Sequence, residues 1–199
     1  MKHLVLYIHG KGGSAAEANH YRSLFPRCDV VGLDYRSQAP WEAKEEFPRL
    51  FDKCSAGYET VTLIANSIGA FFAMSALSEK HIDRALLISP IVDMERLICD
   101  MMTWANVTES ELRHRGEIST TFGETLSWDY LCYVRSHPLF WRVPTRILYG
   151  ENDALTSLAT ISAFADRIGA PLTAMPGGEH WFHTEEQMAF LDRWVKEEI

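Results

Sequence analysis

Six short runs dominated by apolar residues alternate with longer amphipathic segments, and this rhythm most constrains the fold. The runs span residues 4–8, 30–33, 60–65, 85–89, 145–149 and 172–175. Their lengths and near-continuous apolar character are typical of strands in a parallel sheet that is covered on both faces. Helical patterns are predicted between or after the runs, at residues 14–24, 41–53, 68–78, 155–168 and 185–198. This order predicts a three-layer α/β/α fold around a mainly parallel six-stranded sheet.

One long segment interrupts the alternation. Residues 92–141, about 50 in number, lie between the fourth and fifth runs without a clear strand and exceed an ordinary crossover. We interpret them as a helical lid or cap insertion within a single domain of residues 1–199. Trp104, Trp128 and Trp141 are predicted to bind an apolar part of the substrate. The alternative is that these aromatic side chains form the core of the insertion itself.

Charge and composition exclude several classes of protein. Asp and Glu number 27 against 19 Lys and Arg, and a net charge of −8 argues against nucleic-acid binding. The run at residues 4–8 is too short for the core of a signal peptide, and no run reaches the length of a membrane span. The four cysteines form no CxxC pair, which favours free thiols in a reducing cytoplasm over a zinc site. We expect a cytoplasmic protein without a membrane partner and without a metal or other cofactor.

Ser67 is the candidate nucleophile. It lies in Ala65-Asn66-Ser67-Ile68-Gly69, where the third predicted strand meets a helix. A serine at such a strained turn needs small neighbours, and Ala65 and Gly69 meet that need. The helix N-terminus would direct the Ile68 amide at the reacting carbonyl, where it can stabilise an oxyanion. An ordinary serine at a helix N-cap would show a similar pattern.

Asp153 and His180 are the candidate partners of Ser67. Asp153 lies shortly after the fifth predicted strand and His180 shortly after the sixth. Since the carboxyl ends of parallel strands share one edge, all three side chains should gather there. A serine hydroxyl needs a base, and that base needs a carboxylate to orient it. Asp93 and Glu151 remain alternatives for the acid, and His183 and His137 are the competing histidines.

These motifs together resemble those of the α/β-hydrolase superfamily, over nearly the whole chain. The resemblance rests on His9-Gly10, the turn at Ser67, Gly150-Glu151-Asn152-Asp153 and Gly178-Glu179-His180. It implies a strand order of 2-1-3-4-5-6, counted along this chain. It also implies a second oxyanion amide from Lys11, with Gly12 as the alternative. Ala65 departs from the glycine that is usual at this point of the motif.

The expected activity is that of a serine hydrolase that cleaves a small or medium apolar carboxylic ester through an acyl-enzyme. Its partner would be a small-molecule ester. A thioesterase, an acyltransferase or peptidase, and a non-catalytic ligand-binding protein of the same fold remain alternatives. A weaker rival is an NAD(P)-binding loop, because Gly10, Gly12 and Ala15 match G-x-G-x-x-A and Asp34 ends the next strand.

Overall fold

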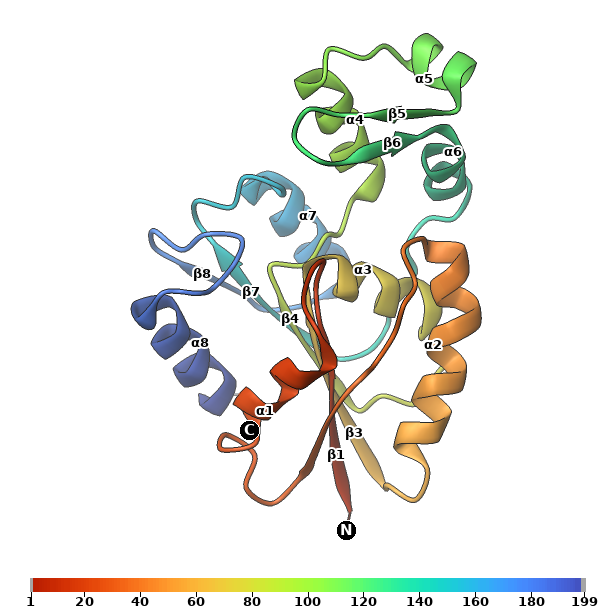
Figure 1. Ribbon diagram of the computed structural model, residues 1–199. Helices are drawn as coiled ribbons and strands as arrows, with labels where there is room; N and C mark the ends of the chain where they lie inside the picture. The colour runs from red at the N-terminus through yellow and green to blue at the C-terminus, as the bar shows by residue number, and fades with distance from the viewer. Residues whose placement is uncertain (1, 198–199) are drawn as a thin grey trace. The chain divides into compact units, whose positions relative to one another are not determined.

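A six-stranded, fully parallel sheet forms the centre of the computed structural model, which describes residues 2–197 (Figure 1). The strand order is β2-β1-β3-β4-β7-β8. The strands are β1 (His3–Ile8), β2 (Asp29–Gly32), β3 (Thr60–Asn66), β4 (Arg84–Ile88), β7 (Thr145–Gly150) and β8 (Leu172–Met175). The predicted fold class is confirmed, and the order is the one that the resemblance implied.

Helices cover both faces of this sheet. The short α1 (Ala18–Tyr21) and the C-terminal α8 (Glu185–Glu197) lie on one face, and α2 (Pro40–Ser55) and α3 (Ser67–Ala76) pack together on the other (Figure 1). α7 (Leu158–Ile168) connects β7 to β8. The longest helix, α2, has 16 residues, and no helix within residues 2–197 has the length and apolarity needed to cross a membrane.

The sheet is buried on both faces, as its apolar strands predict. Along β1, Val5 and Tyr7 belong to the core cluster that includes Tyr21 of α1 and Trp194 of α8. Because side chains alternate along a strand, Leu4, Leu6 and Ile8 face the opposite layer. All five residues of β1 from position 4 on are at most 1% exposed. This burial on both sides explains the nearly unbroken apolar run.

The helix expected at residues 14–24 is much shorter than predicted. A single 3-10 turn, η1 (Ala15–Glu17), precedes the four residues of α1. Beyond Tyr21 the chain makes turns, with the Leu24 and Phe25 amides both donating to Tyr21 O. A proline follows at position 26, and the residue before a proline disfavours helical geometry. Ser14 precedes the 3-10 turn, and its amide donates to Glu17 Oε1 at 3.0 Å.

The described residues divide into two compact units. The larger comprises the residues up to Val92 and from Phe140 on, and the smaller is Asp93–Leu139. The smaller unit contains α4 (Met94–Trp104), α5 (Glu109–Arg115), the hairpin β5 (Glu117–Ser119) and β6 (Thr125–Ser127), and α6 (Trp128–Ser136). The Arg135 guanidinium of α6 donates hydrogen bonds to the carboxylates of Glu95 in α4 and Glu109 in α5, so it links the three helices of the smaller unit.

The hairpin corrects the expectation that this segment is helical throughout. Its strands have three residues each, with only Ile118 and Leu126 buried at their centres. Three residues are too few to display the alternation that marks a strand in a sequence. Eight apolar side chains of the smaller unit are buried: Met94, Leu97, Ile98, Met102, Leu112, Ile118, Leu126 and Leu131.

Candidate active site

Ser67 occupies a strained turn between β3 and α3. Its φ is 49°, a left-handed value that is uncommon for a residue other than glycine. The small residues expected around it are needed for close packing. A Cβ at Gly69 would collide with the carbonyl oxygen of His9, and one at Gly10 would lie 3.2 Å from Ser67 Cβ. The turn therefore holds the serine between β3 and the loop that follows β1.

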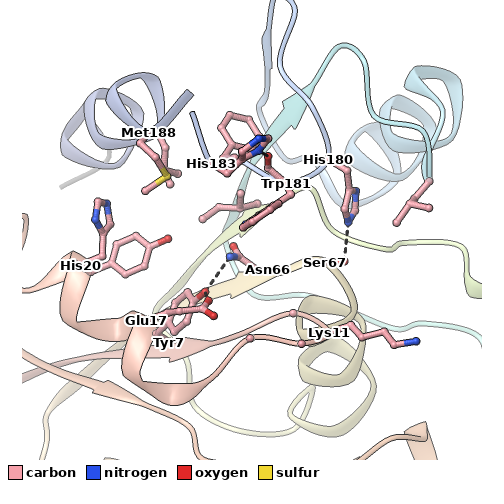
Figure 2. A pocket seen from close by; sticks show the side chains of 18 residues that line it. Tyr7, Lys11, Glu17, His20, Asn66, Ser67, His180, Trp181, His183 and Met188 are labelled. Carbon is pink, nitrogen blue, oxygen red and sulfur yellow. Dashed lines mark hydrogen bonds between the residues drawn. The ribbon is translucent and has the colours of Figure 1, made fainter. Parts of the chain in front are cut away.

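Ser67, His180 and Asp153 form a continuous hydrogen-bonded chain. Ser67 Oγ lies 2.7 Å from His180 Nε2 (Figure 2), and His180 Nδ1 lies 2.7 Å from Asp153 Oδ2. The Asp153 side chain is fully buried, and its Oδ1 accepts bonds from the amides of Leu155 and Thr156. These contacts leave the carboxylate one orientation. The structure thus brings together the three residues that the sequence singled out.

The loop after β7 and the loop after β8 are joined by backbone hydrogen bonds, and they position Asp153 and His180. The Asn152 amide donates to Gly178 O at 2.7 Å, and the Glu151 amide donates to Met175 O at 3.1 Å. A Cβ at Gly150 would collide with Glu179 O, so only glycine permits this approach. The Glu151 carboxylate accepts the Gly177 amide, which gives this alternative acid a role in holding the loop.

Contacts with the aromatic side chain of Tyr35 hold the loop after β1 in place. The His9 ring stacks on Tyr35 with centroids 4.3 Å apart, and Tyr35 Oη donates to His9 O at 2.8 Å. A turn closed by the Gly13 amide and Gly10 O follows. Lys11 lines the same cavity as Ser67. Ile68 is the second residue of α3, where the amide has no partner within the helix.

A cavity of about 790 Å³ opens beside Ser67 and His180 (Figure 2). Its residues all belong to the larger unit. The apolar lining comprises Ile88, Leu155, Trp181, Phe182, Met188 and Leu191. Polar side chains also contribute, among them Tyr7, Glu17 and Asn66. No motif in the sequence marks these three as functional, although Tyr7 is the one residue with a polar group in the first apolar run and Asn66 directly precedes Ser67.

The described structure closely matches solved structures, whereas the sequence matches no family model and no curated protein. Est1E from Butyrivibrio proteoclasticus aligns with a TM-score of 0.77 at 14% identity, over 98% of this chain and 86% of that one. Alpha/beta hydrolase domain-containing protein 10 from mouse gives the same score and identity, over 98% and 88%. The chain has the α/β-hydrolase fold. A thioesterase domain from the curacin biosynthetic pathway also aligns, with a TM-score of 0.61 and 16% identity over 98% and 91%.

In this α/β-hydrolase fold, Trp141 lies near the start of β7 and is buried. It is 5% exposed, and its Nε1 donates to Thr145 Oγ1 at the amino end of β7. Ser67 lies at the carboxyl edge of the sheet, roughly 16 Å further along a strand of this length. Trp141 is therefore a largely buried residue near the amino end of β7, and its part in substrate binding stays a prediction.

Trp104 and Trp128 belong to the smaller unit. Trp104 is 52% exposed and makes an edge contact with Phe122, with ring centroids 6.1 Å apart. The Arg113 guanidinium lies 5.8 Å from the centroid of Trp128. Their part in substrate binding stays a prediction.

The remaining alternatives have other roles in this α/β-hydrolase fold. Asp93 caps α4 by accepting the Arg96 amide at 2.9 Å. His183 stacks on Trp181, and His137 of the smaller unit stacks on Tyr133.

The described part of the chain has neither the arrangement of a dinucleotide site nor that of a metal site. The glycine loop leads into a single 3-10 turn rather than the long helix of a dinucleotide site. Within residues 2–197, no three His, Cys, Asp or Glu side chains are grouped as metal ligands.

Proposed function

We propose that this protein is a serine hydrolase that cleaves a small or medium apolar carboxylic ester through an acyl-enzyme. The observation that carries the proposal is the chain of two 2.7 Å bonds from Ser67 through His180 to a buried Asp153. A weak hydroxyl nucleophile becomes reactive when a base accepts its proton and a carboxylate stabilises the charged base. The strained turn adds support, since it presents the hydroxyl at the mouth of a cavity.

The reaction follows from these positions in two balanced halves. His180 Nε2 accepts the Ser67 proton as Oγ attacks the carbonyl carbon, and the oxyanion accepts bonds from the Ile68 and Lys11 amides. Collapse of this intermediate breaks the bond to the alcohol, which leaves with the proton from His180. Water then gives its proton to His180 and attacks the acyl-enzyme. The acid leaves, and Ser67 regains its proton.

The lining of the cavity supports an apolar substrate. Phe182, Met188 and Leu191 belong to, or pack against, the core between the sheet and α8, and they present apolar surface beside Ser67. Such surface favours hydrocarbon over a highly charged group. Thioesters with the same acyl groups are the closest chemical alternative, since the same acyl-enzyme forms from both.

Cytoplasmic location is part of the proposal. The four cysteines, Cys28, Cys54, Cys99 and Cys132, are free thiols in this structure, as proteins of reducing compartments usually have them.

A substrate panel tests the proposed function. The rates of p-nitrophenyl esters and of acyl-CoA thioesters with rising acyl length are compared for the wild type, Ser67→Ala and Ser75→Ala. We expect ester hydrolysis in the wild type and Ser75→Ala, a control in the same helix, and a loss of at least about 10⁴-fold in kcat in Ser67→Ala. A folded wild type that cleaves no ester or thioester, or an active Ser67→Ala, would refute the proposal. Preference for thioesters would replace the proposed substrate class.

A further inference from the structure

Tyr7, Asn66 and Glu17 form a second hydrogen-bonded chain, on the wall of the cavity that contains Ser67. Asn66 Nδ2 donates to Tyr7 Oη at 2.9 Å, and Tyr7 Oη donates to Glu17 Oε2 at 2.6 Å (Figure 2). The sheet places the first two together. Tyr7 of β1 is in register with Ile64 of β3, and Asn66 lies two residues further along the same face.

The protons in this chain have a fixed direction. Burial, with smaller effects from Tyr21 and Glu17, raises the pKa of Tyr7 far above its ordinary value. The phenol therefore keeps its single proton, which it donates to Glu17. Its oxygen can then only accept from Asn66, so the amide must turn its nitrogen toward Tyr7. The amide oxygen of Asn66 consequently points away from Tyr7.

Asn66 Oδ1 is buried, and no donor of the described residues lies within hydrogen-bond distance of it. The side chain does not cap α3 either, although Asn66 occupies the N-cap position. A buried amide oxygen without a partner destabilises the folded state, and such atoms are rare in folded proteins. Asn66 is a lining residue and directly precedes Ser67, so a molecule bound at Ser67 could supply the missing donor once a local movement of the cavity wall uncovers this oxygen, which is buried in the structure.

Glu17 gives the same wall a further capacity to accept hydrogen bonds. Its Oε1 accepts the Ser14 amide and its Oε2 accepts Tyr7, and each carboxylate oxygen has room for a second bond. The negative charge would repel a carboxylate or phosphate at this end of the cavity. A hydroxyl or an ammonium group could donate a hydrogen bond to the unpartnered amide oxygen. The negative charge of Glu17 does not repel a hydroxyl, and it attracts an ammonium group. Met188 and Leu191, which line the same cavity, offer only apolar surface.

We infer that the substrate of this site is a mostly apolar ester that carries one hydrogen-bond donor, a hydroxyl or an ammonium group, close to the scissile bond. The donor binds Asn66 Oδ1, with Glu17 nearby to favour it. The inference rests on the proposed ester hydrolysis and specifies its substrate class. Tyr7 is a positioning residue here, because it orients the Asn66 amide.

Pairs of esters that exchange a donor for a methyl group test this inference. In the acyl series, methyl β-hydroxybutanoate and methyl β-aminobutanoate are compared with methyl β-methylbutanoate. In the alcohol series, β-hydroxypropyl butanoate is compared with isobutyl butanoate. The measured quantity is kcat/KM, from titration of the acid released. We expect at least about a tenfold preference for the donor in one series, because a site built around a hydrogen bond discriminates strongly against its loss.

Variants of Asn66 and Tyr7 then test whether these residues cause the preference for esters with a donor. In Asn66→Ala the preference should fall close to one, and in Tyr7→Phe it should fall by several-fold, since the amide is no longer oriented. Asn19→Ala, an exposed asparagine of α1 outside the cavity lining, should keep the wild-type preference. Labelling of Ser67 by a fluorophosphonate shows that each variant is folded, and Tyr7→Phe remains informative if Asn66→Ala is not.

The outcomes separate the inference from the proposed function. Hydrolysis through Ser67 without a preference for the donor, or with a preference that survives in Asn66→Ala, overturns the inference alone. No hydrolysis of any ester together with no labelling of Ser67 overturns the proposed function and the inference with it.

Discussion

Ser67 Oγ and His180 Nε2 lie 2.7 Å apart, although 113 positions separate the two residues in the chain. Their strands, β3 and β8, are not neighbours, since β4 and β7 lie between them in the sheet. The loop after β8 therefore has to reach back along the edge of the sheet, and its bonds to the loop after β7 define its path. The proposed catalytic pair thus depends on the packing of three separate loops.

The charge of Asp153 is expected to be essential for the rate. Asp153→Asn preserves the shape of the side chain but removes the carboxylate that orients and stabilises a protonated His180. We expect kcat for a p-nitrophenyl ester to fall by about 10⁴-fold, as for the equivalent change in other triads. Asp93→Asn is the matched control, because Asp93 caps α4 and an asparagine can still accept the Arg96 amide. A loss below tenfold in Asp153→Asn, or an equal loss in the control, would assign the acid elsewhere.

Tyr35 is expected to position the loop that contains the Lys11 amide. Its hydroxyl holds His9 O at 2.8 Å, and its ring stacks on the His9 ring. Tyr35→Phe keeps the stack and removes the bond. We expect kcat to fall by roughly tenfold, about the effect of one hydrogen bond, with KM changed less. Steady-state kinetics on one ester give both constants. A rise in KM at constant kcat would instead indicate a role in binding the substrate.

Gly69 should tolerate no side chain. The added Cβ of Gly69→Ala would meet His9 O, so the turn and the loop after β1 would have to separate. We expect the free energy of unfolding to fall by about 1–3 kcal/mol, the usual cost of overpacking. Ser75→Ala in the same helix should stay within about 0.5 kcal/mol of the wild type. Urea denaturation measures both, and equal stability of the two variants would show that the turn can relax.

Glu46 is expected to make stability depend on pH. Its partial burial by itself would raise the pKa, but bonds from Ser37 Oγ and from the Arg36 and Ser37 amides outweigh this and lower it. A lowered folded pKa contributes stability above the unfolded value of about 4.3, and this is lost as the pH falls through the folded pKa.

The comparison of Tm for wild type and Glu46→Gln checks this dependence. The wild type should be more stable at about pH 7, and the difference should shrink toward about pH 3. Glu45→Gln, an exposed neighbour on α2, is the control and should show a smaller difference. A difference for Glu46→Gln that is constant over this range would contradict the assignment.

The strands and the three clustered residues could be predicted because each depends on a local pattern. Buried parallel strands have nearly continuous apolar sequences, and Ser67, Asp153 and His180 each lie shortly after the end of such a run. The shared edge of a parallel sheet then brings them together without any knowledge of the loops. For the same reason the short strands β5 and β6, which lack a readable period, were missed.

The Tyr7–Asn66–Glu17 chain could not be predicted, because it depends on strand register. Only the pairing of Tyr7 with Ile64 decides that Tyr7 and Asn66 share a face. In the sequence, Tyr7 is one residue of the apolar run at residues 4–8, and no pattern connects it with Glu17 or Asn66. The environment of Trp141 could not be predicted either, since its position at the end of the segment 92–141 does not reveal that its indole is buried and donates to Thr145 Oγ1.

Covalent labelling tests the central claim most directly. The wild type, Ser67→Ala and Ser75→Ala are incubated with a fluorophosphonate, and intact mass and peptide mapping locate the adduct. The account predicts one adduct per chain, on Ser67, in the wild type and in Ser75→Ala, and none in Ser67→Ala. A folded wild type that remains unlabelled, or an adduct that persists in Ser67→Ala, would contradict it.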